Sequence, residues 1–457
     1  MAKTLFRNGI ILTLAKDSTP LHGQDILIDG DRIAAIGPNL VVSVDTTIID
    51  ATDMYIMPGL INSHIHTWQT GLRGLATDWT GTNYFRAMHA GLANFFSPDD
   101  ILIANQVGAI NQINNGVTTM VDWHHNNPTP EHSDAAIDGL EDAGIRAVFL
   151  HGSAKPDPKP GQKHFSKVPM SRSEVARLRT GRLASDDALV TMGLAILGPQ
   201  MSKEEVVLQD LRLAKEHDLV VSLHHSAAKM AAPQAYQSAA AAGLIDARLN
   251  IVHGNELTDA DLNILIDNGA NFTVTAEIEM QICYGDLLCG RLLARGVPFS
   301  IGTDIESAYA PDMLACSRFT LQAQRHLSSV QMMAETGERP HPIPITVREA
   351  ISWATEHGAR AMRLDHRTGS LEVGKQADII TIRANDLNLS GGFDPLNTIL
   401  GFAHPGNIDT VMVAGHVHKR GGVMLRQDIP ALQDRLAESG RRIFEEFKKK
   451  SATAEFA

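Results

Sequence analysis

Eight short apolar runs, separated by stretches of helical character, are the feature that most limits what this chain can fold into. The stretches between them include helices that we predict at residues 98–115, 134–143, 203–216 and 259–268. Apolar runs that alternate with helices are typical of parallel strands joined by crossover helices. Eight runs predict an α/β fold of the (β/α)8 TIM-barrel type. The runs occupy residues 56–63, 117–122, 147–150, 192–197, 220–223, 250–252, 272–274 and 299–301.

The two ends of the chain differ from this middle part. Short strand-like segments fill the first 57 residues, where Asp29-Gly30-Asp31 between two alternating stretches indicates a hairpin, and they return after residue 365. The first set is too short to bury a core alone, so we predict that both sets pair in one small β-sandwich domain. The predicted organisation is a composite β-sandwich (residues 1–57 and 365–425), a barrel (58–364) with a polar loop over one end (153–187), and a C-terminal helix (426–457).

Composition excludes several classes of protein. The net charge of −12 argues against a surface for nucleic acid or for an anionic membrane. The three cysteines, Cys283, Cys289 and Cys316, form no CxxC pair, so neither a disulfide framework nor a thiolate zinc site is predicted. No uninterrupted apolar stretch of about 18 residues and no signal-peptide pattern occurs. We therefore expect a soluble cytoplasmic protein.

Two His-x-His motifs occur in this histidine-rich chain. His64 and His66 end the first apolar run, where strand alternation points both imidazoles the same way, as one metal ion requires. His416 and His418 have the same spacing, but they follow a glycine turn in the C-terminal strand set. Active sites of such barrels lie at the carboxyl ends of the strands. Position therefore favours the first pair as metal ligands and the second as surface histidines.

Further polar residues end other runs of the predicted barrel. His224 and His225 end the fifth run, His253 ends the sixth and Asp304 ends the eighth. Taken singly, the histidine pair is a polar end of a strand, and Asp304 is a helix cap or half of an ion pair. Taken together, they form the set of groups from different strand ends that a barrel active site needs.

With these motifs in view, the chain resembles the amidohydrolase superfamily, in the branch of atrazine chlorohydrolase, S-adenosylhomocysteine deaminase and cytosine deaminase-like enzymes. The resemblance implies a barrel with a split sheet domain, and it implies a homodimer or a larger homo-oligomer. It rests on the entry segment 57–66 with Gln69 and Arg73, on Gly116-Val117-Thr118-Thr119, on Leu223-His224, Val252-His253 and Gly302-Thr303-Asp304, and on the closing segment 369–378.

The resemblance also implies a ligand set and a reaction. His64, His66, His224 and Asp304 would be metal ligands, and His253 would polarise the substrate or position the attacking water. Because the fourth run has no lysine to bridge two metals, we expect one divalent ion, zinc or iron. A divalent ion lowers the pKa of bound water from 15.7 to about 7. Asp304 would be ligand and proton acceptor together. The predicted function is hydrolysis of a carbon–nitrogen bond in a small planar nitrogenous compound, by a deaminase or an amidase.

One position departs from the family pattern. Deaminases of this branch have a proton-shuttle glutamate three residues after the fifth-strand histidine, where this chain has Ala227. Either the shuttle is missing, or a local gap puts His225 on the metal. The departure leaves two alternatives open: a hydrolase that displaces chloride from a heterocycle, and a degenerate barrel that binds without turnover. We expect substrate contacts from residues near predicted strand ends: Gln69, Trp123, His125, and the acidic pair Glu277 and Glu279, which alternation would place on one side.

Overall fold

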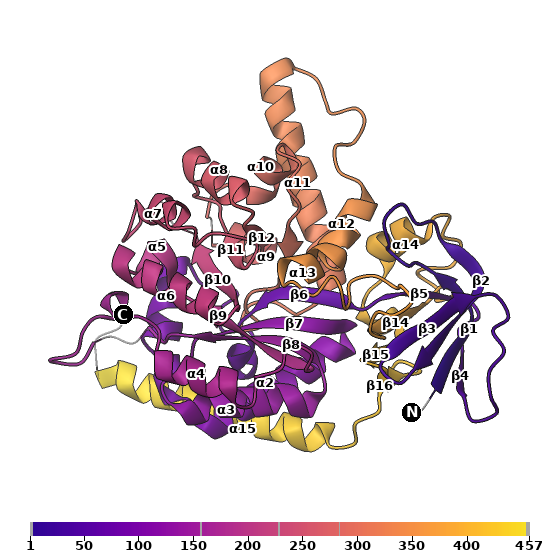
Figure 1. Cartoon of the computed structure of the whole chain (residues 1–457), viewed down its shortest axis with the longest axis horizontal. Helices are drawn as coiled ribbons and strands as arrows, with labels where there is room; N and C mark the ends of the chain where they lie inside the picture. The colour runs from indigo at the N-terminus through magenta and orange to yellow at the C-terminus, as the bar shows by residue number, and fades with distance from the viewer. Residues whose placement is uncertain (1–2, 156–157, 227–228, 283, 454–457) are drawn as a thin grey trace.

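The computed structural model describes residues 3–155, 158–226, 229–282 and 284–453. Two sheets organise the chain (Figure 1): a sheet of eight strands from the middle of the sequence, and a nine-stranded sheet from its two ends. This confirms the predicted barrel with a second sheet domain built from both terminal segments.

The central sheet has eight parallel strands whose spatial order follows the sequence. An isolated bridge between Ile65 and Asp304 brings its first and last strands together, so the barrel is nearly closed. Its strands are buried along most of their length, as expected of parallel strands covered by helices. They are β6 (Leu60–Ile65), β7 (Val117–His124), β8 (Arg146–Gly152), β9 (Val190–Ala195), β10 (Val220–His225), β11 (Leu249–His253), β12 (Asn271–Val274) and β13 (Ser300–Ile301).

Helices cover the outside of this barrel (Figure 1). Those predicted from the sequence are observed as α2 (Pro98–Asn114), α3 (Pro130–Ala143), α6 (Glu204–Glu216) and α8 (Asp259–Asp267). The others are η1 (Thr67–Leu72), α1 (Gly81–Tyr84), η2 (Phe85–His89), η3 (Leu92–Phe95), α5 (Gly198–Met201), α7 (Ala235–Ala241), α9 (Ala276–Gln281), α10 (Leu288–Leu293), α11 (Met313–Thr336), α12 (Val347–Trp353) and α13 (Glu356–Ala361).

The segment 153–187, predicted as a long loop, contains two helices, η4 (Phe165–Lys167) and α4 (Arg172–Thr180). Ser171 caps α4 by accepting a hydrogen bond from the Glu174 amide, and Val175 and Leu178 are buried beneath it. The prediction of an irregular segment was therefore wrong for residues 172–180. The segment is polar overall, so the helical signal of the Ser171 cap followed by Val175 and Leu178 was overlooked.

The terminal sheet joins the two ends of the chain. In its centre β5 pairs antiparallel with β14 and parallel with β1, so strands more than 300 residues apart in sequence share one sheet. The expected hairpin is the pair β2 and β3, where Asp29 faces Arg32. The strands are β1 (Lys3–Ile11), β2 (Leu21–Asp29), β3 (Arg32–Gly37), β4 (Thr47–Asp50), β5 (Met54–Pro58), β14 (Ile379–Arg383), β15 (Ile408–Val413), β16 (His416–Arg420) and β17 (Val423–Met424).

A buried ion pair joins the barrel to the terminal sheet. Arg146 at the start of β8 donates to both carboxylate oxygens of Asp378, with an Nε to Oδ2 distance of 2.7 Å. Asp378 also accepts a hydrogen bond from the amide of Ala414. Because the pair is bidentate and shielded from water, it defines the relative position of barrel and sheet.

The remaining helices lie toward the C-terminus: α14 (Pro395–Phe402), η5 (Pro405–Asn407) and α15 (Ile429–Thr453). Helix α15 falls in the segment 426–457, for which we predict a C-terminal helix, and it packs on α2 below the barrel (Figure 1). Its contact face contains Leu432, Leu436 and Ile443. None of the helices in the described ranges is long and apolar enough to span a membrane.

Candidate metal centre and active site

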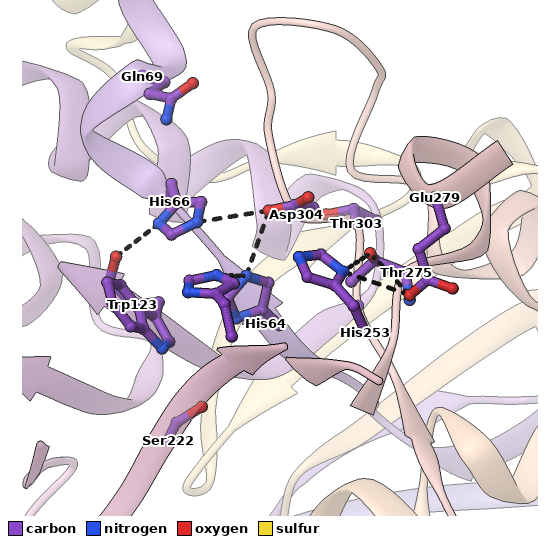
Figure 2. Close-up of polar contacts among 12 residues, drawn as sticks. His64, His66, Gln69, Trp123, Ser222, His253, Thr275, Glu279, Thr303 and Asp304 are labelled. Carbon is purple, nitrogen blue, oxygen red and sulfur yellow. Dashed lines mark hydrogen bonds and ion pairs between the residues drawn. The ribbon is translucent and has the colours of Figure 1, made fainter. Parts of the chain in front are cut away.

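Three imidazoles and one carboxylate meet at the carboxyl end of the barrel (Figure 2). His64 comes from β6, His66 follows that strand and Asp304 follows β13, as labelled in Figure 2. The third imidazole is that of His224, from β10. The atoms that they offer to a ligand all lie within 4.8 Å of one another. His64 Nε2 is 3.2 Å from Asp304 Oδ1 and 3.2 Å from His224 Nε2, and His66 Nε2 is 3.4 Å from Asp304 Oδ1.

The backbone around Asp304 explains how this convergence arises. The Asp304 amide donates to the carbonyl oxygen of His64, and the His66 amide donates to the carbonyl oxygen of Asp304. Asp304 has a φ of 63°, in the left-handed region that is uncommon outside glycine. A Cβ at Gly302 would lie 2.6 Å from the carbonyl oxygen of His64, so this approach requires glycine. The closure of the barrel therefore also positions the carboxylate.

The histidines of the cluster are neutral. Burial, together with the neighbouring His64, lowers the pKa of His66 to about 3, and burial also lowers the pKa of His64 and His224. His66 Nδ1 donates to the carbonyl oxygen of Trp123 at 2.7 Å, which directs the lone pair of Nε2 into the cluster. Burial opposes ionisation of Asp304, yet its hydrogen bond with His64 and the nearby imidazoles hold its pKa below the ordinary value.

These donors fit a divalent cation. Neutral imidazoles each offer one lone pair and the carboxylate offers a negative charge, which is a donor set for zinc or iron. Two imidazole nitrogens that face each other at 3.2 Å repel unless a proton or a cation shares their lone pairs. A cation between them and Asp304 would satisfy all four side chains at once.

His253, at the end of β11, lies beside this cluster, and its Nδ1 contacts polar groups on the side away from the cluster (Figure 2). Its Nδ1 lies 3.0 Å from the hydroxyl of Thr275 and 3.3 Å from Glu279 Oε1. The Glu279 carboxylate is itself fixed by hydrogen bonds from the Thr275 amide and from Asn255 Nδ2. Since Nδ1 is occupied, Nε2 is the ring nitrogen left for the cavity.

The structure separates the adjacent histidines of β10. His224 joins the cluster, whereas His225 Nδ1 hydrogen-bonds the hydroxyl of Tyr236 at 3.0 Å. Side chains of neighbouring strand residues point to opposite faces, so the two cannot exchange roles without a shift of register. The alternative in which a local gap directs His225 to the metal is therefore wrong. Ala227 lies outside the described residues.

Glu277 and Glu279 do not share one side, as strand alternation suggested. Both belong to helix α9, where residues two positions apart point in nearly opposite directions. Glu279 is buried against His253, while Glu277 lies near Asp312 and its pKa is raised to about 7, by burial first and then by that charge. Among the described residues, neither carboxylate lines the cavity.

Gln69 and Trp123 lie behind the cavity wall. Gln69 Nε2 donates to the hydroxyl of Tyr84 at 2.6 Å, and Gln69 Oε1 accepts from the hydroxyl of Ser307. Trp123 is fully buried, with its ring centroid 4.3 Å from that of His224. Both residues therefore position groups that line the cavity, and neither lines it directly.

The cavity opens directly above the cluster, with His66, His224, His253 and Asp304 in its inner wall. A wider outer cavity of about 520 Å³ continues from it past Phe85, Gln200, Ser226 and Tyr284. Most of the polar lining of the inner cavity comes from short helices and loops that no sequence motif indicates: Tyr84, His89, Lys155, Gln200, Ser226 and Tyr284. Lys155 alone had a signal, since it belongs to the segment expected over the barrel end.

Comparisons with known proteins agree with this architecture. The model of the amidohydrolase family matches residues 55–418. The chain is 25% identical over 456 residues to 5-methylthioadenosine/S-adenosylhomocysteine deaminase of Desulforudis audaxviator, covering 97% of this chain and 99% of the relative. It is 25% identical over 420 residues to 5'-deoxyadenosine deaminase of Methanothermobacter thermautotrophicus, covering 89% and 91%.

Solved structures show the same fold at lower identity. A zinc-bound adenosine deaminase from Xanthomonas campestris superposes with a TM-score of 0.81 at 20% identity, covering 97% of this chain and 99% of that one. A zinc complex of atrazine chlorohydrolase from Arthrobacter aurescens TC1 superposes with a TM-score of 0.80 at 19% identity, covering 96% and 100%.

Proposed function

This chain belongs to the amidohydrolase family, and we propose that it is a metal-dependent hydrolase that breaks a carbon–nitrogen bond, other than a peptide bond, in a small planar nitrogenous compound. The observation that carries the proposal is the convergence of His64, His66, His224 and Asp304 below an open cavity. Relatives named as deaminases of adenosine derivatives support release of ammonia from a ring, and hydrolysis of a cyclic amide uses the same geometry.

One divalent ion, zinc or iron, would be held by His64, His66, His224 and Asp304. When bound, such an ion supplies Lewis acidity that brings the pKa of water close to neutral. The buried, neutral imidazoles can give their lone pairs to it without first losing a proton.

Asp304 and His253 are the proposed catalytic residues. Asp304 has a second carboxylate oxygen that can hold a proton from the attacking water and pass it to the leaving nitrogen. His253 Nε2 faces the cavity and stabilises negative charge that develops on the attacked centre. Glu279 acts through His253: by accepting a hydrogen bond at Nδ1 it orients the ring and leaves Nε2 for the cavity.

Three of the residues predicted to contact the substrate, Gln69, Trp123 and His125, lie in two different places relative to the cavity above the cluster. Gln69 and Trp123 support the wall, through Tyr84 and His224 respectively. His125 lines a second cavity at the side. A homo-oligomer stays a prediction from the family resemblance, and a cytoplasmic location stays a prediction from the composition.

Metal content and turnover test the proposal together. The purified protein should bind one equivalent of zinc or iron and release ammonia from a compound in a panel of amino-purines, amino-pyrimidines, amino-triazines and cyclic amides. His64→Ala should lose the metal and lower turnover at least about a thousandfold. His416→Ala, in the second His-x-His motif, is the matched control and should change neither. Full activity of a metal-free His64→Ala protein would refute the proposal.

Hydrolytic dehalogenation is the second candidate function, and Ala227 is the observation that favours it. A chloride leaving group needs no proton, so the missing glutamate would cost nothing in that reaction. Chloro- and amino-substituted triazines of the same ring distinguish the two reactions. Chloride release without ammonia from any compound of the panel would favour the dehalogenase.

A further inference from the structure

A second cavity of about 120 Å³ opens beside the first and shares His89 and Lys155 with it. It lies between the ends of η2 and β7, and its lining residue His125 separates it from the metal cluster, with a ring centroid 4.6 Å from that of His66. Its lining is mostly apolar or donor-rich and, in the described part of the chain, includes no carboxylate: His89, Ala93, Asn94, Phe96, His125, Asn126, Pro128, Ala154 and Lys155.

Lys155 is a half-buried cation that forms no ion pair with the carboxylates of the described residues. Its Nζ lies 5.4 Å from the ring centroid of Trp123 and 5.8 Å from that of Phe85, both favourable cation–π positions. No ion pair joins it to a carboxylate of the described residues. Burial lowers its pKa to about 8, so the ammonium group stays protonated at neutral pH. Partial removal of an ammonium group from water costs free energy when no described carboxylate pairs with it, and an anionic ligand in the cavity would offset that cost.

His125 is the second sign of a missing ligand. It is almost fully buried, and neither of its ring nitrogens has a hydrogen-bond partner among the described residues. Its ring centroid is 4.6 Å from that of His89. An imidazole ring carries at least one N–H, so each of the two rings can donate a hydrogen bond to a ligand in the cavity. Unsatisfied buried donors are uncommon and require an explanation.

We propose that His89, His125 and Lys155 form a subsite for an anionic group of the substrate, a carboxylate or an ionised ring oxygen, so that the substrate is an acidic planar heterocycle. The inference rests on the proposed function, because the metal cluster is taken to hold the reacting bond. Lys155 would supply the charge and the two imidazoles would supply directional N–H donors, the combination that carboxylates bind most strongly.

The balance of charge in the two cavities supports this choice. Asp304 is the only carboxylate, and Lys155 the only lysine or arginine, among the described residues that line either cavity. Asp304 faces the histidines and would be neutralised by an ion there. Lys155 would then be left as an uncompensated positive charge, which a neutral heterocycle does not remove and an anion does.

Binding of matched probes tests the subsite without turnover. The probes are nicotinate with nicotinamide, and 5-carboxycytosine with its amide; within each pair the ring and shape are kept and the charge changes. Affinity for metal-loaded protein is read from tryptophan fluorescence, because Trp123 lies beside Lys155. The wild-type protein should bind each acid at least about tenfold more tightly than its amide.

Three variants locate the cause of this preference. Lys155→Met should weaken binding of the acids about tenfold or more and change binding of the amides less than about twofold. Lys155→Arg should keep the preference for acids. Lys163→Met, an exposed lysine of the same segment, is the control and should behave as wild type, with metal content equal in all.

The outcomes separate this inference from the proposed function. Equal or tighter binding of the amides by wild type, or no binding of any probe, overturns the subsite. A preference for acids that persists in Lys155→Met also overturns it, since the metal would then hold the acid. Loss of the preference in that variant supports the subsite even if no compound is hydrolysed, and a failed turnover assay would count only against the hydrolase.

Discussion

The floor of the active site and its walls are built from different kinds of chain segment. The floor, formed by His64, His66, His224 and Asp304, lies on or next to barrel strands joined by backbone hydrogen bonds. The walls come from short helices and loops such as α1, η2 and the segment after β8. Groups that a metal requires must be held rigidly, whereas groups that select a substrate can sit on segments that vary.

This difference predicts where substitutions abolish the reaction and where they only retune it. Floor residues should have large effects that are the same for every substrate. Residues that support the floor should have intermediate effects, and wall residues should have small effects that depend on the substrate. Two pairs of variants, each with a neighbouring residue of the same type as its control, and one variant of the wall examine this order.

The largest contrast is expected between the neighbouring histidines of β10. His224→Gln should remove the metal and lower kcat/KM about a thousandfold or more, because a ligand at the centre of the cluster is lost. His225→Gln leaves the four clustered side chains in place and disturbs the hydrogen bonds of His225 with Tyr236 and the Glu256 backbone, so it should cost about 1 kcal/mol of stability. Metal analysis, kinetics and thermal unfolding of both variants give the answer. Equal loss of metal in both would contradict the assignment of His224.

A smaller contrast is expected between the two glutamates of α9. Glu279→Gln should lower kcat about a hundredfold with the metal retained, because His253 loses the carboxylate that orients it. Glu277→Gln should leave kcat within about twofold, since Glu277 faces away from His253. If both variants have wild-type kcat, the support of His253 by Glu279 is not needed for turnover.

Ionisation of Glu277 should instead make the free energy of unfolding depend on pH. In the folded protein its pKa is raised from 4.5 to about 7, so the fold favours the protonated form. Below the unfolded pKa of 4.5 the Glu277 carboxyl is protonated in both states and the full stability of the wild-type protein is present. As pH rises through about 7, the free energy of unfolding decreases, because the carboxyl ionises more readily in the unfolded chain. Glu277→Gln should therefore be more stable than wild type at about pH 8, by up to about 3 kcal/mol, and equal to it near pH 4. Denaturant unfolding at both pH values measures the difference, and a constant difference would exclude titration as its cause.

The smallest effect is expected at the wall. Tyr284 lies with its ring centroid 5.6 Å from that of His253 and lines the cavity. Tyr284→Phe keeps the ring and removes one polar group, so KM should rise about tenfold or less and kcat should change little. The size of the effect should differ among substrates. A uniform loss of kcat as large as that of Glu279→Gln would place Tyr284 with the floor.

Much of the fold could be predicted from the sequence, because the spacing of apolar residues indicates which segments are buried strands and which are helices. The eight apolar runs correspond to β6–β13, and the residues ending runs one, five and eight meet in the cluster. The errors arose where local pattern was ambiguous. Glu277 and Glu279 were read with the period of a strand although they lie on a helix, and α4 was concealed by its polar composition.

The polar walls of the cavity were not accessible in the same way. Tyr84, His89 and Tyr284 belong to no repeating pattern, and their side chains reach the cavity only because the intervening loops fold over the barrel end. The relation of Glu279 to His253 is likewise a contact between helix α9 and the end of strand β11, two elements that are separate in the sequence. No local signal distinguishes such a contact from an exposed carboxylate.

The barrel, the split sheet and the side chains proposed to bind a metal could be predicted from the amino-acid sequence, because the hydrophobic period indicates which strand faces are buried and where each strand ends. The three-dimensional fold was needed to show that His224 rather than His225 joins the cluster, that Glu279 contacts His253, and that Lys155 and His125 line one cavity. These relations depend on register and loop paths. Both are set by packing among residues far apart in the chain, which no local pattern encodes.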